Sequence, residues 1–149
     1  MASFAGLTPA SASTSRVKRA NRSMDTRHER VLRSLLWRDG LRFRKNDRSV
    51  VGKPDVVFRR ERVAVFCDGD FWHGRNWQRR SRRLGSGTNG AYWVEKIRNN
   101  IRRDRRIDEV LAREGWHVIR LWETDILKDP LACAKRVRTL LRRVRANMS

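Results

Sequence analysis

Acidic and basic side chains follow an apolar run near the middle of the chain, in an order that a structural core does not need. Residues 63–74 read VAVFCDGDFWHG, so the apolar half leads directly into Asp68, Asp70 and His73. Converging carboxylate oxygens favour a hard cation such as Mg²⁺. A lone histidine is usually a packing residue, but beside such acids its near-neutral pKa suits a general base. The segment therefore predicts a cation site with a histidine beside it.

Asp55 lies at the start of another apolar run, directly after the turn formed by residues 52–54. A buried carboxylate without a partner is costly, so Asp55 must be solvated, paired or bound to a cation. The alternative is an ordinary turn aspartate. The runs 56–58 and 63–66 flank a charged turn and predict a hairpin of buried strands. This hairpin would place Asp55 close to Asp68 and Asp70.

A third acid, Asp104, falls in a long helix predicted over residues 91–114. At 100° per residue, one helix face carries Trp93, Ile97, Ile101, Asp104, Asp108 and Leu111. Asp104 could pair with a neighbouring arginine of its own helix, but its position on the apolar face favours a partner from the sheet. We expect that partner to be His73, because a carboxylate can fix the tautomer of a catalytic imidazole.

The remaining elements predict one α/β domain with a small mixed sheet flanked by helices. Thr26 can cap a first helix that ends at Gly40, with Glu29 at the capping-box position. Glu29 alone is more often a capping carboxylate than a catalyst. A short extended segment follows at 41–44, then a mobile surface loop over 74–90, a strand over 117–122 and a basic helix over 131–144. We expect a flexible basic arm over residues 1–22 and the folded domain over 23–146.

The charge of the chain favours nucleic acid as its partner. Its 149 residues contain 36 Lys and Arg against 16 Asp and Glu, a net charge of +20. A membrane-surface protein would concentrate basic residues on one amphipathic helix, whereas here arginines occur in every segment. Two cysteines form no disulfide scaffold, and no apolar run is long enough for a membrane span. With no secretory signal at its start, the chain is expected in the cytoplasm.

Five ordered segments resemble a known enzyme family. They are GKPD at 52–55, VFCDGDFWHG at 65–74, WVEKI at 93–97 with Asn100 and RDRR at 103–106, GW at 115–116, and LWE at 121–123. Together, over about residues 22–122, they resemble the very short patch repair (Vsr) endonucleases. The resemblance implies a restriction-endonuclease-like fold and a Mg²⁺-dependent DNA endonuclease, with Mn²⁺ as an alternative metal.

The resemblance also implies a role for each site residue. Asp55 would be the central metal ligand, and the backbone carbonyl of Cys67 would complete the metal site. His73 would activate the attacking water, and Asp104 would orient His73. Two further carboxylates would act through waters around the metal: Glu29 and Asp68.

Aromatic residues would contact the DNA beside a mismatch. Phe71, Trp72 and Trp93 stand at the positions where the family inserts rings between bases, which costs less where pairing is faulty. Core packing is the alternative for Trp93. Lys96 and Asn100 stand where the family contacts the mismatched bases.

The chain departs from the family at a structural zinc site. Asp70, Arg75, Trp77 and Thr124 occupy positions that hold zinc ligands in the best-studied relatives, and three of these four are poor ligands. We therefore expect no structural zinc. Position 68 is an aspartate where a relative can have histidine, which leaves the details of the mechanism open.

The leading hypothesis is a monomeric nickase that cuts one strand of double-stranded DNA at a T·G mismatch, in bacterial DNA repair at the nucleoid. The same site could instead act on matched or modified DNA in restriction, homing or defence. The third hypothesis is a non-catalytic basic DNA-binding protein. It predicts that Asp55, His73 and Asp104 lie far apart.

Overall fold

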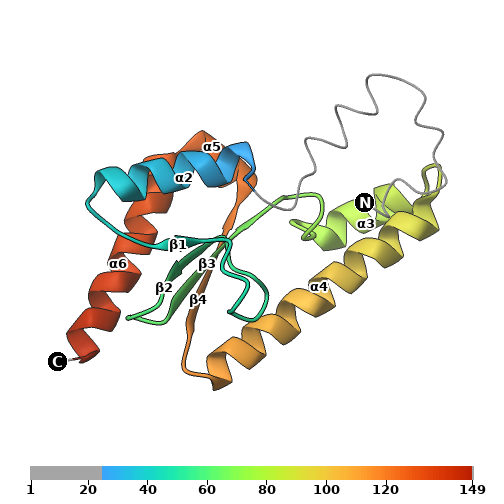
Figure 1. Cartoon of the computed structure of the whole chain (residues 1–149). Helices are drawn as coiled ribbons and strands as arrows, with labels where there is room; N and C mark the ends of the chain where they lie inside the picture. The colour runs from blue at the N-terminus through green and yellow to red at the C-terminus, as the bar shows by residue number, and fades with distance from the viewer. Residues whose placement is uncertain (1–24, 149) are drawn as a thin grey trace.

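A four-stranded mixed sheet forms the centre of the molecule, in a computed structural model that describes residues 25–148 (Figure 1). The predicted arm over residues 1–22 lies outside this described part. The strands are β1 (Arg44–Lys45), β2 (Val56–Phe58), β3 (Val63–Asp68) and β4 (His117–Trp122), and they lie in that order across the sheet. β2 is antiparallel to β1 and β3, whereas β4 is parallel to β3. The α/β class predicted from the sequence is confirmed, and the sheet and its helices form a restriction-endonuclease-like fold.

The predicted β2–β3 hairpin is confirmed, with Val56 opposite Val65 and Phe58 opposite Val63. All six residues of β3 are buried, because helices cover both faces of the sheet. Side chains alternate between the two faces along a strand. Val63, Val65 and Cys67 therefore pack on one helix layer, and the intervening residues of β3 face the other.

Three helices form the first layer: α2 (Arg27–Arg38), α5 (Glu123–Lys128) and α6 (Pro130–Met148). Thr26 caps α2 by accepting a hydrogen bond from the backbone N–H of Glu29, as the sequence predicts. Apolar side chains of these helices bury the first face of the sheet: Leu32, Leu36, Ile126, Val137 and Leu141. The short helix α5 has no counterpart among the expected elements. It joins β4 directly to α6.

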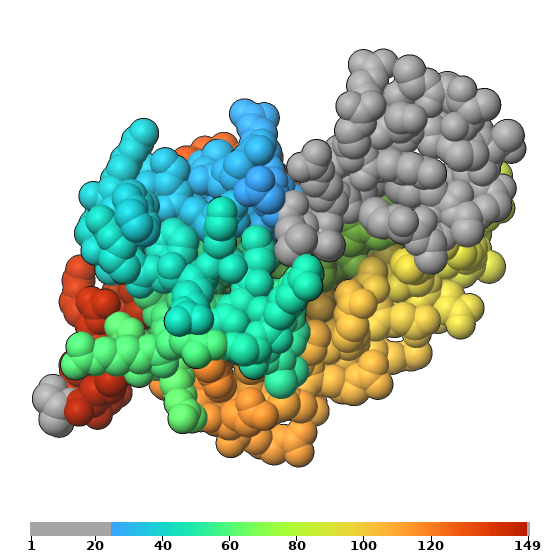
Figure 2. Space-filling model, in the orientation of Figure 1, coloured from blue at the N-terminus to red at the C-terminus, as the bar shows by residue number. Residues whose placement is uncertain are grey.

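The second layer is α4 (Gly90–Arg113), which follows the predicted long helix closely. Leu111 and Ile107 pack against Ala64 and Phe66 of β3. Figure 2 shows the segment that follows β1 (teal) lying between α2 (blue) and α4 (yellow to orange). No helix in the described part of the chain is long and apolar enough to cross a membrane.

The expectation of a mobile loop over residues 74–90 is wrong, because a helix, α3 (Trp77–Gly85), occupies its middle and packs on α4. Two of the four glycines that suggested a loop lie at helix ends. Gly85 is the last residue of α3 and Gly90 the first of α4, where a Cβ atom would come within 2.4 Å of the Gly85 carbonyl oxygen. Gly90 thus permits the close approach of the two helices.

Two further glycines seat the loops that enter the site against α4. Gly74 has a φ of +74°, and a Cβ atom there would lie 2.4 Å from Cδ1 of Ile101. Gly52 has a φ of +81°, and its Cβ would lie 2.5 Å from Cγ2 of Ile107. Both positions combine a left-handed backbone with contact to a helix side chain, so only glycine fits them without strain.

We predict that Gly74→Ala lowers the free energy of unfolding by about 2–4 kcal/mol, the sum of left-handed strain and overpacking against Ile101. Gly40→Ala is the matched control: Gly40 has a φ of +82° with no atom near its Cβ position. It should lose only the strain, about 1–2 kcal/mol. Urea unfolding measures both. Equal losses would contradict the close contact between the Gly74 loop and α4.

Candidate active site

A pocket of about 590 Å³ opens where β2 begins and β3 ends, between the N-terminus of α2 and the middle of α4. Apart from Trp93 and Asp70, every site residue predicted from the sequence lines this pocket: Glu29, Asp55, Cys67, Asp68, Phe71, Trp72, His73, Lys96, Asn100 and Asp104. The third hypothesis expected Asp55, His73 and Asp104 to lie far apart. The fold instead brings them to one cavity.

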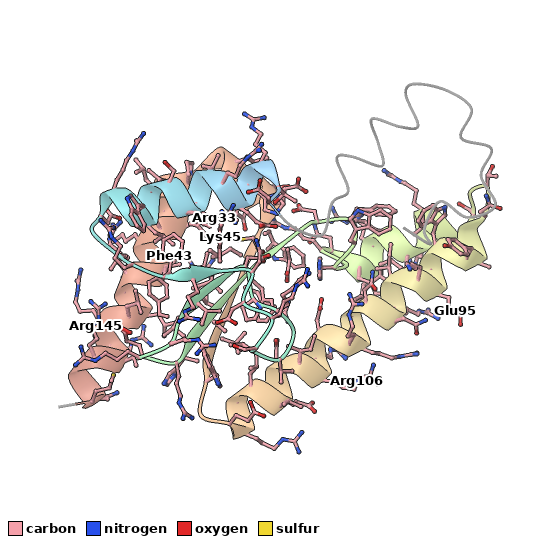
Figure 3. All side chains as sticks on the ribbon, in the orientation of Figure 1. Arg33, Phe43, Lys45, Glu95, Arg106 and Arg145 are labelled. Carbon is pink, nitrogen blue, oxygen red and sulfur yellow. The ribbon has the colours of Figure 1, made fainter. Side chains whose placement is uncertain are left out.

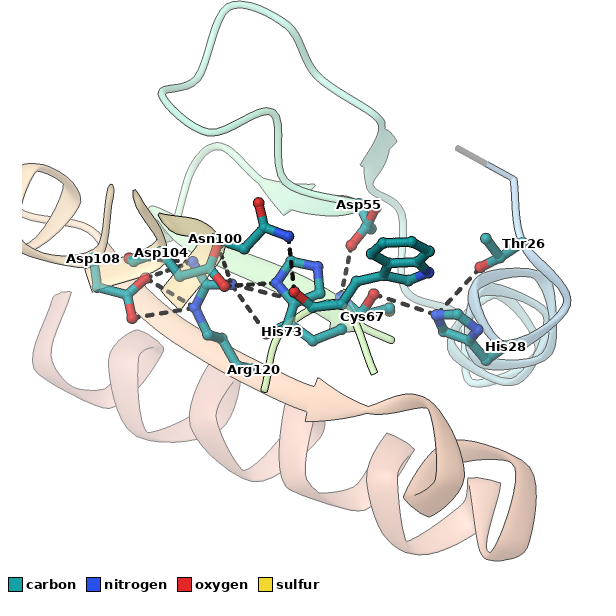
Figure 4. A network of polar contacts seen from close by, with 11 residues as sticks. Thr26, His28, Asp55, Cys67, His73, Asn100, Asp104, Asp108 and Arg120 are labelled. Atoms are coloured by element: carbon teal, nitrogen blue, oxygen red, sulfur yellow. Dashed lines mark hydrogen bonds and ion pairs between the residues drawn. The ribbon is translucent and has the colours of Figure 1, made fainter. Parts of the chain in front are cut away.

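Asp55 and Asp68 meet because β2 and β3 are antiparallel neighbours. Asp55 immediately precedes β2 and Asp68 is the last residue of β3, so both lie at the same edge of the sheet. The Asp55 carboxylate accepts a 2.6 Å hydrogen bond from the backbone N–H of Cys67 (Figure 4). This bond holds Asp55 against the strand that also presents the Cys67 carbonyl.

The Asp55 carboxylate lacks a positive partner among the described side chains. Burial raises the pKa of Asp55 to about 8, with a further contribution from the negative charge of Glu29. Glu29 is itself buried, but it is bonded to Arg33 at 3.1 Å. Asp55 has only the Cys67 N–H to offset its burial. A buried carboxylate in this state favours a cation, and the Cys67 carbonyl and Glu29 supply the oxygen donors that Mg²⁺ prefers. The residues present therefore fit a divalent metal ion.

His73 lies beside this acidic group and is held by Asp104, as the sequence analysis expected. Its Nδ1 lies 2.6 Å from a carboxylate oxygen of Asp104 and 3.8 Å from one of Asp68. Nδ1 must carry the hydrogen of this short bond, because an ionised carboxylate can only accept. Burial lowers the pKa of His73, but the hydrogen bond to Asp104 and the charges of Asp68 and Asp104 outweigh it and raise that pKa above 6.5. The other ring nitrogen, Nε2, takes no part in the bond to Asp104.

Arg120 is a central residue of the site that the sequence analysis missed. Its guanidinium donates to Asp68 at 3.0 Å and to Asp108 at 2.7 and 2.9 Å, and it lies 3.7 Å from Asp104 (Figure 4). It also lies over the Phe66 ring, 4.1 Å from its centroid. The sequence carried one signal for this placement. Side chains alternate along β4, so Arg120 lies on the same face of the sheet as Val118.

His28 is a second residue that was missed. It is 5% exposed, and its Nε2 lies 3.2 Å from the Cys67 carbonyl oxygen and 3.2 Å from Oγ1 of Thr26. Its Nδ1 lies 3.5 Å from a carboxylate oxygen of Glu123. His28 thus links the start of α2 to the backbone at the end of β3. A position two residues after a helix cap offers no sequence signal for such a contact.

Four aromatic rings gather beside the pocket. Trp72 lies 4.9 Å from Phe71 and 5.7 Å from Trp93, measured between ring centroids, and Tyr92 lies 5.1 Å from Trp93. Trp93 is only half-buried, so it belongs to this cluster rather than to the core beneath α4. Asn100 donates to the backbone carbonyl of Trp72 at 3.0 Å and so ties the cluster to α4.

Asp70 does not join Asp55, contrary to the expectation from the hairpin. The chain turns after β3, and the Asp70 carboxylate accepts from the backbone N–H of Thr124 at 3.1 Å and from its hydroxyl at 2.5 Å. Arg75 lies 3.5 Å from Asp70 and 3.1 Å from Asp125. Hydrogen bonds and ion pairs therefore join the His73 loop to α5 at three of the four positions where the family resemblance implied a zinc site. The absence of a structural zinc stays a prediction.

A buried acid cluster beside a carboxylate-held histidine, in a strongly basic chain, offers the groups that metal-dependent hydrolysis of a nucleic acid needs. Comparison with known proteins identifies the family. The family model of the DNA mismatch endonuclease Vsr matches residues 7–79. Together with relatives that match most of its length, this match shows that the chain belongs to the Vsr family, as the resemblance implied, and is an endodeoxyribonuclease.

Individual relatives cover most of the chain. The type II nicking enzyme V.NmeDIP of Neisseria meningitidis serogroup C is 43% identical over 123 residues, which span 83% of this chain and 82% of the relative. The type II nicking enzyme V.HpaIIP of Haemophilus parainfluenzae is 41% identical, over 76% of this chain and 79% of its own length. The DNA mismatch endonuclease Vsr of Escherichia coli K12 is 38% identical, over 75% and 70%.

We predict that Asp55→Asn stabilises the metal-free protein at alkaline pH. The folded-state pKa of Asp55 is raised from 3.8 to about 8, so its favourable contribution to folding is complete below about pH 4 and is lost as the pH rises through 8. Asparagine can keep the bond from Cys67 N–H without the charge. In EDTA, urea unfolding at pH 8 should show a gain of about 1–3 kcal/mol over the wild type.

The gain should shrink as the pH falls towards 4, and Mg²⁺ should reverse it at pH 8. Glu109→Gln, which neutralises an exposed carboxylate on α4, is the control and should show no such pH dependence. If the gain in unfolding free energy for Asp55→Asn were constant with pH, the pKa of Asp55 would not be raised by burial and by Glu29 as described.

Proposed function

We propose that this endonuclease nicks one strand of double-stranded DNA at a T·G mismatch, with Mg²⁺ held by Asp55 and the Cys67 carbonyl. The observation that supports this most is the buried Asp55 carboxylate, which lacks a cationic partner yet lies in one pocket with the His73–Asp104 pair. The family supplies the DNA target, and the pocket supplies the groups for hydrolysis.

The metal's contribution would be to neutralise charge on the scissile phosphate and to hold the reacting groups in line. Oxygen donors at Asp55 and Cys67 suit Mg²⁺, and Mn²⁺ is the alternative. Glu29 and Asp68 flank these donors and would hold water around them. His28 keeps the Cys67 carbonyl in place from the other side.

His73 would accept the proton of the attacking water at Nε2. Asp104 binds Nδ1, so it orients the ring and fixes the tautomer that leaves Nε2 as an acceptor. Asp104 also stabilises the imidazolium once the proton has moved. The division of labour resembles other His–Asp pairs, in which the carboxylate positions the base and does not itself take the proton.

The aromatic cluster would recognise the mismatched duplex. Phe71, Trp72 and Trp93 offer partly exposed rings, and insertion of such rings between base steps costs least where the pairing is weak. Lys96 would contact the mismatched bases. Asn100 already donates one amide hydrogen to Trp72, so it would place the cluster as well as offer its remaining groups to a base.

Positive charge around the pocket would bind the DNA backbone. Lys53, Lys96 and Arg103 line the same cavity as the acids. In a chain of net charge +20, such groups draw phosphates towards carboxylates that would otherwise repel them. Binding as a monomer would place a single active site on the duplex, which accounts for one nick rather than a double-strand break.

Nicking of matched or modified DNA is the second candidate, and the relatives named type II nicking enzymes favour it. Their names mention no mismatch. The same catalytic residues would serve this reaction, and only the contacts with bases would differ.

We predict that wild-type protein with Mg²⁺ nicks a labelled T·G duplex in one strand and leaves the matched duplex intact. Asp55→Ala should lose the metal, and His73→Ala the base. A positioned general base contributes about 10²–10⁴-fold, so His73→Ala should slow nicking by that factor. Glu95→Gln, on the exposed side of α4, is the control and should keep the wild-type rate (Figure 3). Cleavage of the matched duplex at the same rate would favour the second candidate instead.

We predict that the nicking rate rises with pH through the raised pKa of His73, because only the neutral imidazole accepts a proton. Asp104→Asn removes the negative charge that raises this pKa and leaves at most a weaker, neutral hydrogen bond to the ring. The rising part of the pH–rate profile should therefore move to lower pH, and the plateau should fall because the amide can also bind the ring in the wrong tautomer. Single-turnover rates between pH 5 and 9 measure both effects. If the pH at which the nicking rate rises were the same in Asp104→Asn as in the wild type, His73 would not be the titrating base.

A further inference from the structure

The pocket contains a second set of potential metal ligands, separate from the Asp55 group. One ligand atom each from Asp68, His73 and Asp104 lie within 4.8 Å of one another. Two carboxylates and an imidazole at this spacing are a donor set that transition metals such as Zn²⁺ accept. A metal bound at Nδ1 of His73, the nitrogen beside Asp68 and Asp104, would however force the ring proton onto Nε2, where the proposed base needs a lone pair.

Arg120 already fills the position of a cation in this second set. Its Nη1 lies 3.0 Å from Asp68 and 3.7 Å from Asp104. These contacts use carboxylate lone pairs that a metal would need. A fixed positive charge at this range also repels a divalent ion strongly in a partly buried site.

The guanidinium is held so that it cannot readily leave. Two of its nitrogens bond to Asp108 at 2.7 and 2.9 Å, and its Cζ lies over the Phe66 ring. Phe66 is the residue opposite Arg120 in the β3–β4 register. The Arg120 side chain is 20% exposed, so solvent weakens these ion pairs only in part. The other set of potential ligands consists of Asp55, Glu29 and the Cys67 carbonyl. Arg33 bonds Glu29 there, but no described arginine bonds Asp55.

We propose that Arg120 is a positioning residue that keeps metal ions out of the Asp68–His73–Asp104 cluster and thereby keeps His73 available as a base. Arg120 would compensate Asp68 and Asp104, and Asp55 would be left for the catalytic metal. The catalytic half of this inference rests on the proposed function, but the exclusion of metal can be tested without any activity.

The test is a Zn²⁺ titration by calorimetry in an Asp55→Asn background, which silences the proposed catalytic metal site. Addition of Arg120→Gln should tighten Zn²⁺ binding at least tenfold. A further His73→Gln should abolish the gain, and long-range ¹H–¹⁵N spectra should show Zn²⁺ on the His73 imidazole only in the Arg120→Gln protein. Arg120→Met, whose side chain keeps contact with Phe66, provides the same test in a second variant.

Two controls separate exclusion from a change in overall charge. Arg106→Gln removes an exposed arginine from α4 and should leave Zn²⁺ affinity within twofold of the parent (Figure 3). Arg120→Lys keeps the charge and should restore most of the exclusion. Zn²⁺ affinity that is unchanged in both Arg120→Gln and Arg120→Met would overturn the proposal.

A second measurement addresses the catalytic consequence. With Asp55 intact, Arg120→Gln should lower the single-turnover nicking rate at least tenfold while DNA affinity in EDTA stays within twofold. Zn²⁺ should then inhibit this variant at concentrations at least tenfold lower than it inhibits the wild type. If the wild type nicked no DNA at all, the proposed function would fail, and the Zn²⁺ titration would still decide the role of Arg120.

Discussion

Burial of several carboxylates at one end of β3 is the constraint on which the structure of the site depends. Each acid must be neutralised, because a buried charge without a partner is costly. Arg33 compensates Glu29, and Arg120 compensates Asp68, but Asp55 has no cationic partner among the described residues. A chain of net charge +20 has ample arginine, so the lack of one at Asp55 is a specific feature of this pocket.

The sheet turns this constraint into a geometry. β3 is buried on both faces, and its alternation sends Ala64, Phe66 and Asp68 towards α4 while its other side chains pack on α2 and α6. The same strand end supplies the Cys67 carbonyl and begins the loop that carries His73. α4 completes the site from the opposite side with Asp104. Packing and the proposed catalysis therefore depend on the same strand, and a change that shifts β3 also moves the Cys67 carbonyl, Asp68 and the start of the His73 loop.

Local patterns predicted much of this arrangement. Apolar runs around the turn at 59–62 predicted the hairpin, and the helical period put Asp104 on the face that contacts His73. The same reasoning missed α3, because glycines at helix ends resemble those of a loop, and it misplaced Asp70, whose direction depends on the turn after β3. Arg120 and His28 were missed because their partners come from distant segments. Family resemblance supplied the roles that no local pattern could, above all the Cys67 carbonyl.

We infer that a divalent ion completes the charge balance at Asp55. An anomalous difference map from crystals grown with Mn²⁺ and a DNA duplex would show whether it does. We expect a peak at about 2.2 Å from the Asp55 carboxylate and from the Cys67 carbonyl oxygen, with the His73–Asp104 bond intact beside it. A peak bonded to His73 instead, or no peak within reach of Asp55, would show that Asp55 does not hold the metal.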